Sequence, residues 1–389
     1  MHRKLIVLLI MILIGFSAFA EADYYAEGIY VGTAVDYGLG GPYPTDNDGL
    51  ETIFANPAGF RTAEEDFTFS NLTFHMMGPV FDIAEIVTTA MSGEGEFTDI
   101  LLDSTVQEML SNIYTGIKIT GPVNFGYIGE GFGFGLFNTT DVLIEGTGPL
   151  SLAVGVSEDL LLAGGYSFRI PLTRDEKHAI DIGFMLKGGV EGDLTIEKSF
   201  LELAGTEFGL ELLTDSPLDV TALIGVDAGI QYYWDGIGSI GIAALDIYTP
   251  TMKNTYENGI TGFMASEEPA TEIGLVPMNL NAGFEFNPDF DFLEKFLTDF
   301  RLMAAYDDIL DFWLYPSEAE HWMLHLKAGT ELTLLEILDI RVGVADGLLN
   351  AGVGLDLKIF KINAAMFGTE RASQPDTSPV YNLALGFNF

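Results

Sequence analysis

The chain has 389 residues, a formal net charge of −40 and no cysteine. The absence of cysteine excludes disulfides, cysteine-ligated zinc and thiol catalysis. The acidity argues against a nucleic-acid partner, because phosphate binding needs clustered lysine and arginine. A disordered acidic protein is also excluded, since 48% of the residues are hydrophobic and 12% are aromatic.

Residues 1–20 have the pattern of a secretory signal peptide. Arg3 and Lys4 form a basic start, residues 5–16 are apolar, and Ala18-Phe19-Ala20 matches a cleavage site before Glu21. The alternative is a transmembrane anchor. The apolar run is short and ends in small residues, which favours the signal peptide.

Residues 21–65 are rich in glycine and small polar residues and contain the motif Asn56-Pro57-Ala58-Gly59. Asn56 can form an Asx-turn, Pro57 fixes its own φ, and Gly59 tolerates a positive φ. This composition predicts a compact segment held together by turns rather than a strand or a long helix.

Alternation with period two runs through residues 66–389. The second face often carries Gly, Asn or Ala, and the segments are about ten residues long, which favours strands that cross a bilayer over a soluble sandwich. We expect about fourteen strands. They lie at residues 66–76, 114–127, 132–143, 159–170, 179–190, 219–233, 237–248, 276–286, 299–306, 320–330, 337–344, 349–357, 360–367 and 380–389. The predicted fold is an all-β transmembrane antiparallel barrel, with residues 21–65 as a hatch (plug) in its lumen.

The connections between these strands mostly alternate between long and short, as external loops and periplasmic turns do in outer-membrane barrels. Residues 77–113 are predicted to form a helical extracellular loop, because their apolar residues recur at helical spacing. These residues include Ile83, Ile86, Val87, Met91, Leu102, Val106 and Met109. They are expected to form a groove for an apolar ligand. The alternative, that the helices only pack on the barrel rim, stays open.

Two further features concern passage through the barrel. Gly121-Pro122 interrupts the second strand, and proline cannot donate to a strand ladder, so a local opening of the wall is expected there. A simple bend is the alternative. On the lumen face, cations for a ligand carboxylate are expected from strand parity at Arg169, Lys187, Arg301, Lys327 and Arg341. Each of them has the alternative of pairing with a luminal acid such as Asp181, Asp227, Glu285 or Asp339.

The last strand places Tyr381, Phe387 and the terminal Phe389 on one apolar face. A terminal aromatic residue on such a face is similar to the signal that barrel-insertion machinery reads.

The glycine-rich segment ending in Asn56-Pro57-Ala58-Gly59, the even-stranded barrel and the terminal Phe389 together resemble the FadL family. Residues 341–370 also resemble the related branch that includes PorV-type barrels. The resemblance implies uptake of long-chain fatty acids or similar hydrophobic molecules across the bacterial outer membrane, through a plugged barrel with lateral release. Implied partners are outer-membrane lipids, the hydrophobic ligand and the barrel-assembly machinery.

No catalytic constellation, cofactor site or metal site is expected from the sequence, and the barrel is expected to be monomeric. Two other functions stay open. A PorV-like barrel would act as a shuttle or scaffold for surface or secreted proteins without transporting anything. A general porin would instead hold a water-filled channel.

Overall fold

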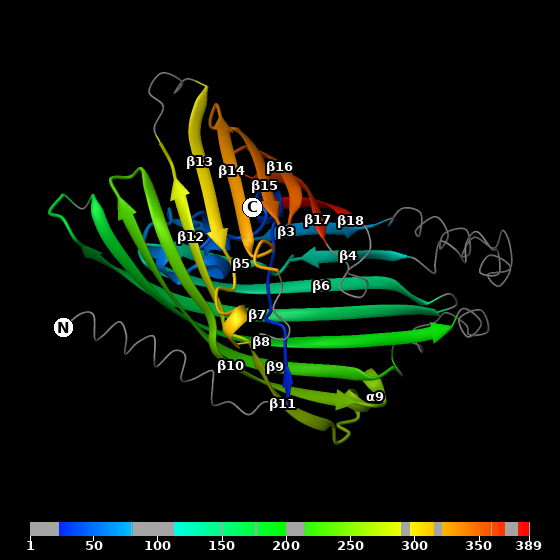
Figure 1. Ribbon diagram of the computed structural model, residues 1–389. Coiled ribbons are helices and arrows are strands. Elements are labelled where there is room, and N and C mark those ends of the chain that lie inside the picture. Colours follow the sequence, from blue (N-terminus) through cyan, green and yellow to red (C-terminus); the bar gives the residue numbers. More distant parts are fainter. Residues whose placement is uncertain are drawn as a thin grey trace.

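The computed structural model describes residues 23–78, 80, 113–148, 151–175, 177–199, 214, 216–288, 296–314, 321–358, 360–369 and 380–388. In these ranges most residues are in β-strands, and all the strands belong to one sheet that closes on itself (Figure 1). Within the same ranges, no helix is both long enough and apolar enough to cross a membrane.

Seventeen strands form the barrel wall. They are β2 (Asp66–Thr68), β3 (Asn71–Met77), β4 (Tyr114–Thr120), β5 (Phe125–Gly129), β6 (Phe132–Gly148), β7 (Ser151–Pro171), β8 (His178–Ser199), β9 (Leu218–Trp234), β10 (Gly238–Tyr256), β11 (Ala270–Val276), β12 (Asn279–Phe286), β13 (Leu297–Tyr306), β14 (Leu326–Leu334), β15 (Leu338–Ala345), β16 (Leu348–Asp356), β17 (Lys361–Thr369) and β18 (Val380–Asn388). β2 with β3, β4 with β5, and β11 with β12 each run in series along one course of the wall, so the barrel has fourteen courses. β18 pairs with β3 and closes the ring. The predicted all-β transmembrane antiparallel barrel is confirmed.

The wall alternates between an apolar outer face and a mixed inner face. On β7, Leu160, Leu162 and Phe168 point outward and are exposed, whereas Leu161 and Ala163 point inward and are buried. Outward apolar side chains recur around the ring, as a strand surface in contact with lipid requires.

The two sides of the wall differ in height. β7 and β8 have 21 and 22 residues, whereas β13 to β18 have 8 to 10 each. Sequence reasoning expected uniform strands of about ten residues, so it underestimated the long side. β6 to β10 continue past the outward apolar band into more polar sequence, such as residues 191–199 of β8. Apolar and small residues do not alternate there, so the sequence pattern does not predict a strand.

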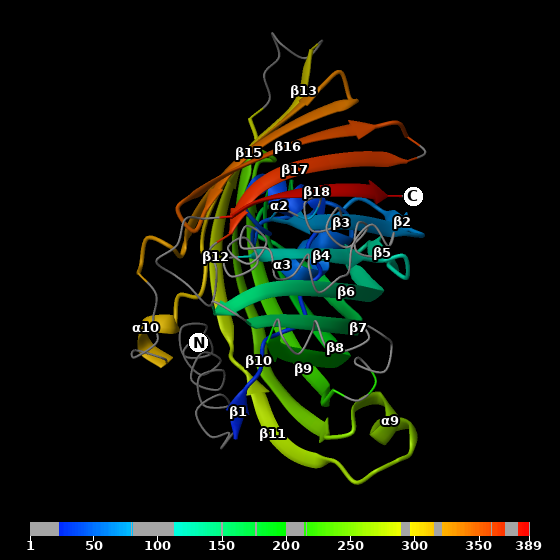
Figure 2. The same ribbon diagram turned by 90° about the vertical axis from the view of Figure 1, so that its right-hand side faces the viewer.

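Residues 26–65, called here the luminal segment, lie inside the ring of strands (Figure 2). The helix α2 (Ala34–Leu39) begins at a capping box between Thr33 and Asp36 and ends at Gly40, which adopts φ +89°. The turns η1 (Gly49–Glu51), α3 (Thr52–Ala55) and η2 (Pro57–Arg61) follow. Their apolar side chains form one core with the wall, in which Ile53 and Phe60 pack with Ile128, Leu161 and Met185.

Glycines of the wall give the luminal segment room to approach the strand backbone. A Cβ atom on Gly183 would overlap the backbone of Pro57, and one on Gly241 would overlap the carbonyl of Pro44. The same holds for Gly229 against Asn56, and for Gly343 against Leu39. Gly133, in the glycine-rich stretch of β6, faces the ring of Phe60, where a Cβ would lie 3.0 Å from it. We call these five residues the glycine belt. The luminal segment can approach the wall this closely only because these positions carry no side chain.

One further strand expectation differs from the structure, and two other expectations fall outside the described residues. The strand expected at residues 320–330 begins only at Leu326, because residues 322–325 form turns. The expected signal peptide and most of the expected helical loop, residues 79 and 81–112, lie outside the described residues.

Candidate functional site

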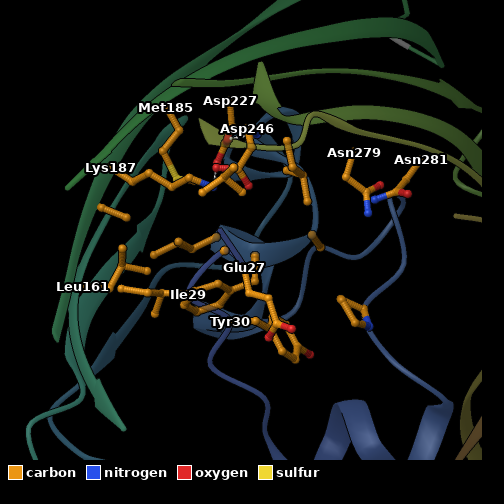
Figure 3. Close-up of a pocket in the computed structure, with 18 of the residues that line it drawn as sticks. Glu27, Ile29, Tyr30, Leu161, Met185, Lys187, Asp227, Asp246, Asn279 and Asn281 are labelled. Carbon is orange, nitrogen blue, oxygen red and sulfur yellow. Dashed lines mark hydrogen bonds and ion pairs between the residues drawn. The ribbon is translucent and has the colours of Figure 1, made fainter. Parts of the chain in front are cut away.

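A cavity of about 460 Å³ lies in the lumen between the luminal segment, strands β7 to β12 and the start of β14 (Figure 3). Its apolar part is formed by Ile29 and Phe54 of the luminal segment and by Leu161, Ala163 and Met185 of the wall. The cavity has the size and mixed lining of a small-molecule site.

An ion triad forms the polar wall of this cavity. The Lys187 ammonium lies 3.1 Å from Asp227 Oδ2 and 2.9 Å from Asp246 Oδ1. The backbone N–H of Asp246 donates to Asp227 Oδ1 at 2.6 Å. Asp246 adopts φ +53° in a bulge where the pairing of β10 with β9 shifts between Ala244 and Tyr248. The bulge turns the Asp246 side chain toward the lumen, where it shares the lysine with Asp227.

The barrel wall is weakly paired beside the cavity. β12 pairs with β13 only from Ala282↔Tyr306 to Phe286↔Leu302. The wall course breaks between β11 and β12, at Pro277, and Val276, Pro277 and Asn279 line the cavity at this break. We call the edge of β11 that faces away from β10 the seam.

A two-residue strand covers the edge of β11 at the seam. β1 (Tyr24–Tyr25) pairs with β11 in parallel, with Tyr24 opposite Gly274 and Tyr25 opposite Leu275. Every other strand pairing in the described ranges is antiparallel. The Tyr24 hydroxyl also lies 2.9 Å from Thr251 Oγ1. Figure 2 shows β1 beside β11, where the chain enters the lumen. β1, which directly precedes the luminal segment, thus lies along the edge of β11 next to the residues Ala26 and Val276 that line the cavity.

The predicted hatch motif lies at the centre of the luminal segment. Asn56 Oδ1 accepts a hydrogen bond from the Ala58 N–H at 2.9 Å, which is the expected Asx-turn, and Asn56 Nδ2 donates to the Pro44 carbonyl at 2.7 Å. Asn56, Pro57, Ala58 and Gly59 are all buried. The motif fixes the turn and ties two stretches of the segment together.

The five predicted luminal cations face the lumen, and each is engaged by an acid. Arg169 forms two hydrogen bonds with Asp181, at 2.8 and 2.7 Å. Lys187 belongs to the triad described above, and Lys327 lies 2.7 Å from Asp307. Arg301 lies between Asp48 of the luminal segment, at 2.6 Å, and Glu331, while Arg341 contacts Glu331 and Asp339. Only Lys187 and Lys327 reach the cavity.

Arg301 and Arg341 line a second luminal cavity together with acids of the luminal segment, and Arg301 pairs with two of these acids, Asp46 and Asp48. The nearby Glu51 carboxyl belongs to that segment and not to a membrane strand. Its burial, reinforced by the charge of Asp36, raises its pKa to about 7. Deprotonation of Glu51 is therefore disfavoured in the lumen relative to water.

The predicted wall opening at Gly121-Pro122 falls between β4 and β5, where two neighbouring courses of the wall are interrupted. An apolar depression lies there, lined by Phe67, Phe69, Val123 and Phe125. The backbone at the interruption is bonded by side chains, since Asn138 Oδ1 accepts from Val123 N–H at 3.0 Å. No residue of β3, β4 or β5 lines the luminal cavity, and an opening at this position stays a prediction.

Other predicted residues fall at or beyond the edge of the described ranges. The expected groove residues Ile83, Ile86, Val87, Met91, Leu102, Val106 and Met109 lie outside the described residues, as does Phe389. Tyr381 lies on the outer face of β18, 56% exposed, and Phe387 shares its strand parity.

Sequence reasoning missed Glu27, Asp246 and the seam. Pro277 was the available signal, because a proline inside a strand pattern marks a break or an edge. Asp246 gave no signal, since its inward direction depends on a bulge that alternation does not reveal.

No known family profile matches the chain, and no curated protein matches it. Solved structures are similar to it in fold. The CymD monoaromatic hydrocarbon channel shares 11% identity over 93% of this chain and 98% of its own, with a TM-score of 0.48. The Ralstonia pickettii toluene transporter TbuX shares 12% identity over 92% and 97%, with a TM-score of 0.44. A Pseudomonas aeruginosa FadL homologue shares 12% identity over 92% and 98%, with a TM-score of 0.43.

Proposed function

We propose that the protein carries hydrophobic molecules across the bacterial outer membrane through its plugged lumen. The observation that carries this proposal is the cavity itself. It lies inside a transmembrane barrel, it has apolar walls at Ile29, Leu161 and Met185, and it reaches the one place where β11 pairs with β1 instead of a wall strand. A scaffold for other proteins would need no such cavity.

The luminal segment argues against a general porin. It packs against the wall through a buried core and against the glycine belt. A water-filled channel at this height would require the segment to leave. We therefore propose that it acts as a hatch, which blocks water and ions while the cavity beside it holds an apolar ligand.

We further propose lateral exchange between the cavity and the bilayer at the seam. Val276, Pro277 and Asn279 line the cavity where the wall course breaks, and in the described part of the chain the neighbouring edge of β11 pairs with the two residues of β1. An apolar molecule that moved sideways here would pass from protein to lipid without crossing water, and so without the cost of hydrating its surface. The opening predicted at Gly121-Pro122 remains the alternative.

Reconstituted vesicles test the transport function. Labelled oleate represents the fatty acids that the family resemblance implies, and labelled 1-dodecanol represents uncharged molecules. We expect at least one of them to cross protein-containing vesicles faster than protein-free vesicles, with little conductance for salt. If neither probe crosses faster, or if the protein conducts ions steadily like a pore, the proposal is wrong. Recovery of bound secreted proteins without transport would favour the scaffold function.

A further inference from the structure

We propose that the luminal cavity selects hydrophobic molecules with a positively charged end, such as alkylammonium ions, and excludes carboxylates. This inference rests on the proposed function, because it names the substrate class of the same cavity.

The first argument is that both cations of the cavity are already engaged. Lys187 is held between Asp227 and Asp246, and Lys327 contacts Asp307 at 2.7 Å and also donates to the carbonyl of Pro42. A ligand carboxylate would have to displace one of these acids from its lysine. At Lys187, displacement would leave the buried carboxylate of Asp227 or Asp246 without its partner, which is costly in a confined site. At Lys327 the cost is smaller, because the Asp307 side chain is partly exposed.

The second argument is the charge balance of the lining. Among the described residues, four carboxylates line the cavity, those of Glu27, Asp227, Asp246 and Asp307, against the two ammonium groups of Lys187 and Lys327. The formal surplus is therefore two negative charges. Glu27 adds its carboxylate from the luminal segment, and Figure 3 shows it across the cavity from Lys187. A cationic end would meet an attractive field here and an anionic end a repulsive one.

The third argument concerns the lumen above the cavity. On the inner face of the tall wall, Asp159 lies directly opposite Glu191 in the strand register, and Asp193 lies directly opposite Asp219. Like charges opposite each other on neighbouring strands destabilise a sheet unless a cation offsets them. Lys118 offsets part of the charge of Asp159 and Glu191, and Lys253 offsets part of the charge of Asp219. These four acids still exceed the two cations, so an anionic ligand entering from this end would meet a net repulsive field and a cationic ligand an attractive one.

A binding experiment with three probes of equal chain length tests this inference. Radiolabelled dodecyltrimethylammonium, 1-dodecanol and dodecanoate are titrated, below their micelle concentrations, onto the intact purified protein in a nonionic detergent. We expect the ammonium probe to bind roughly tenfold or more tighter than dodecanoate, with the alcohol in between. Equal binding of all three, or tighter binding of the carboxylate or of the alcohol than of the ammonium, would overturn the inference.

Glu27 provides the matched variant, because it is exposed within the cavity and lies outside the buried core. Glu27→Gln is expected to lower the preference for ammonium over carboxylate roughly threefold or more. Glu257→Gln removes an equal charge from an exposed turn outside the cavity lining and should leave the preference unchanged. If both variants lower the preference equally, a general surface field is responsible and the cavity is not the selective site.

The outcomes also separate this inference from the proposed function. If no probe binds, the transport proposal fails together with the inference. If dodecanol and dodecanoate bind and cross vesicles as well as the ammonium probe does, the transport proposal stands and only the charge selection is wrong.

Discussion

Asn56 of the luminal segment lies directly against Gly229 of strand β9, so closely that a single added carbon on the glycine would overlap the asparagine side-chain oxygen. The same oxygen accepts the hydrogen bond that closes the Asx-turn. The luminal segment can therefore pack here only because residue 229 of the wall is a glycine and has no side chain.

We expect Gly229→Ala to loosen the luminal segment and to destabilise the protein by about 2 kcal/mol or more, because forced overpacking distorts both the wall and the turn. Denaturant unfolding in detergent measures the change. Hydrogen exchange of residues 52–61 should rise in parallel.

Gly155→Ala is the matched control. It lies on β7, and no atom lies within 4 Å of the position its Cβ would occupy. We expect a change of no more than about 0.5 kcal/mol. Equal effects of the two substitutions would show that strand propensity, and not the contact with Asn56, sets the loss.

Lys187→Met should destabilise the barrel by about 3–5 kcal/mol, because it leaves Asp227 and Asp246 buried without their shared cation. Adding Asp227→Asn and Asp246→Asn to the same protein should restore much of this loss. The three proteins are compared by their unfolding midpoints in the same detergent. If the triple variant is no more stable than Lys187→Met, the loss of stability comes from the packing of the lysine side chain and not from its charge.

Seating of the luminal segment should weaken as pH rises from about 4.5 to about 7. A released Glu51 has a pKa near 4.3, whereas its pKa in the lumen is about 7. Glu51 of the released segment loses its proton at a lower pH than Glu51 in the lumen. Rising pH between the two pKa values therefore favours release, and above about pH 7 the whole free-energy cost of burying the Glu51 carboxylate opposes seating. Hydrogen exchange of residues 34–39 over this pH range measures the effect. Glu51→Gln should flatten the dependence, and an unchanged slope in that variant would assign it to another group.

Cross-linking β1 to β11 should block exchange at the seam. The protein has no native cysteine, so the pair Tyr25→Cys and Leu275→Cys can form the only disulfide. We expect oxidation to slow transport of a labelled probe roughly fivefold or more and reduction to restore it. The pair Ile230→Cys and Ile242→Cys, in register between β9 and β10, is the control. If the oxidised variant with Tyr25→Cys and Leu275→Cys transported the probe at an unchanged rate, β1 would not be a gate.

Alternation in the sequence was sufficient to predict the barrel. This prediction was possible because successive residues of a strand face lipid and lumen in turn. Lipid favours apolar side chains, whereas the lumen accepts polar and small ones. Three of the four suggested acid partners pair with the cations expected on the lumen face, namely Asp181, Asp227 and Asp339.

The seam and the ion triad lay beyond this reasoning. The partner of Tyr24 is Gly274, 250 residues later in the chain, and a two-residue parallel strand has no pattern of its own. Asp246 points inward only because β10 bulges beside it. Contacts that depend on such irregular backbone follow from the packed structure and not from local sequence.

The unequal wall has a consequence for the direction from which ligands approach. At about 3.3 Å per residue, the 22 residues of β8 run for about 70 Å, well beyond an apolar band of about 25 Å even when the strand is tilted. The strands from β13 to β18 are less than half as long. In the described ranges, the wall is therefore tall along β7 and β8 and low along β13 to β18. Under the proposed function, molecules gathered at the membrane surface would reach the low side of the wall before those dissolved in the medium above.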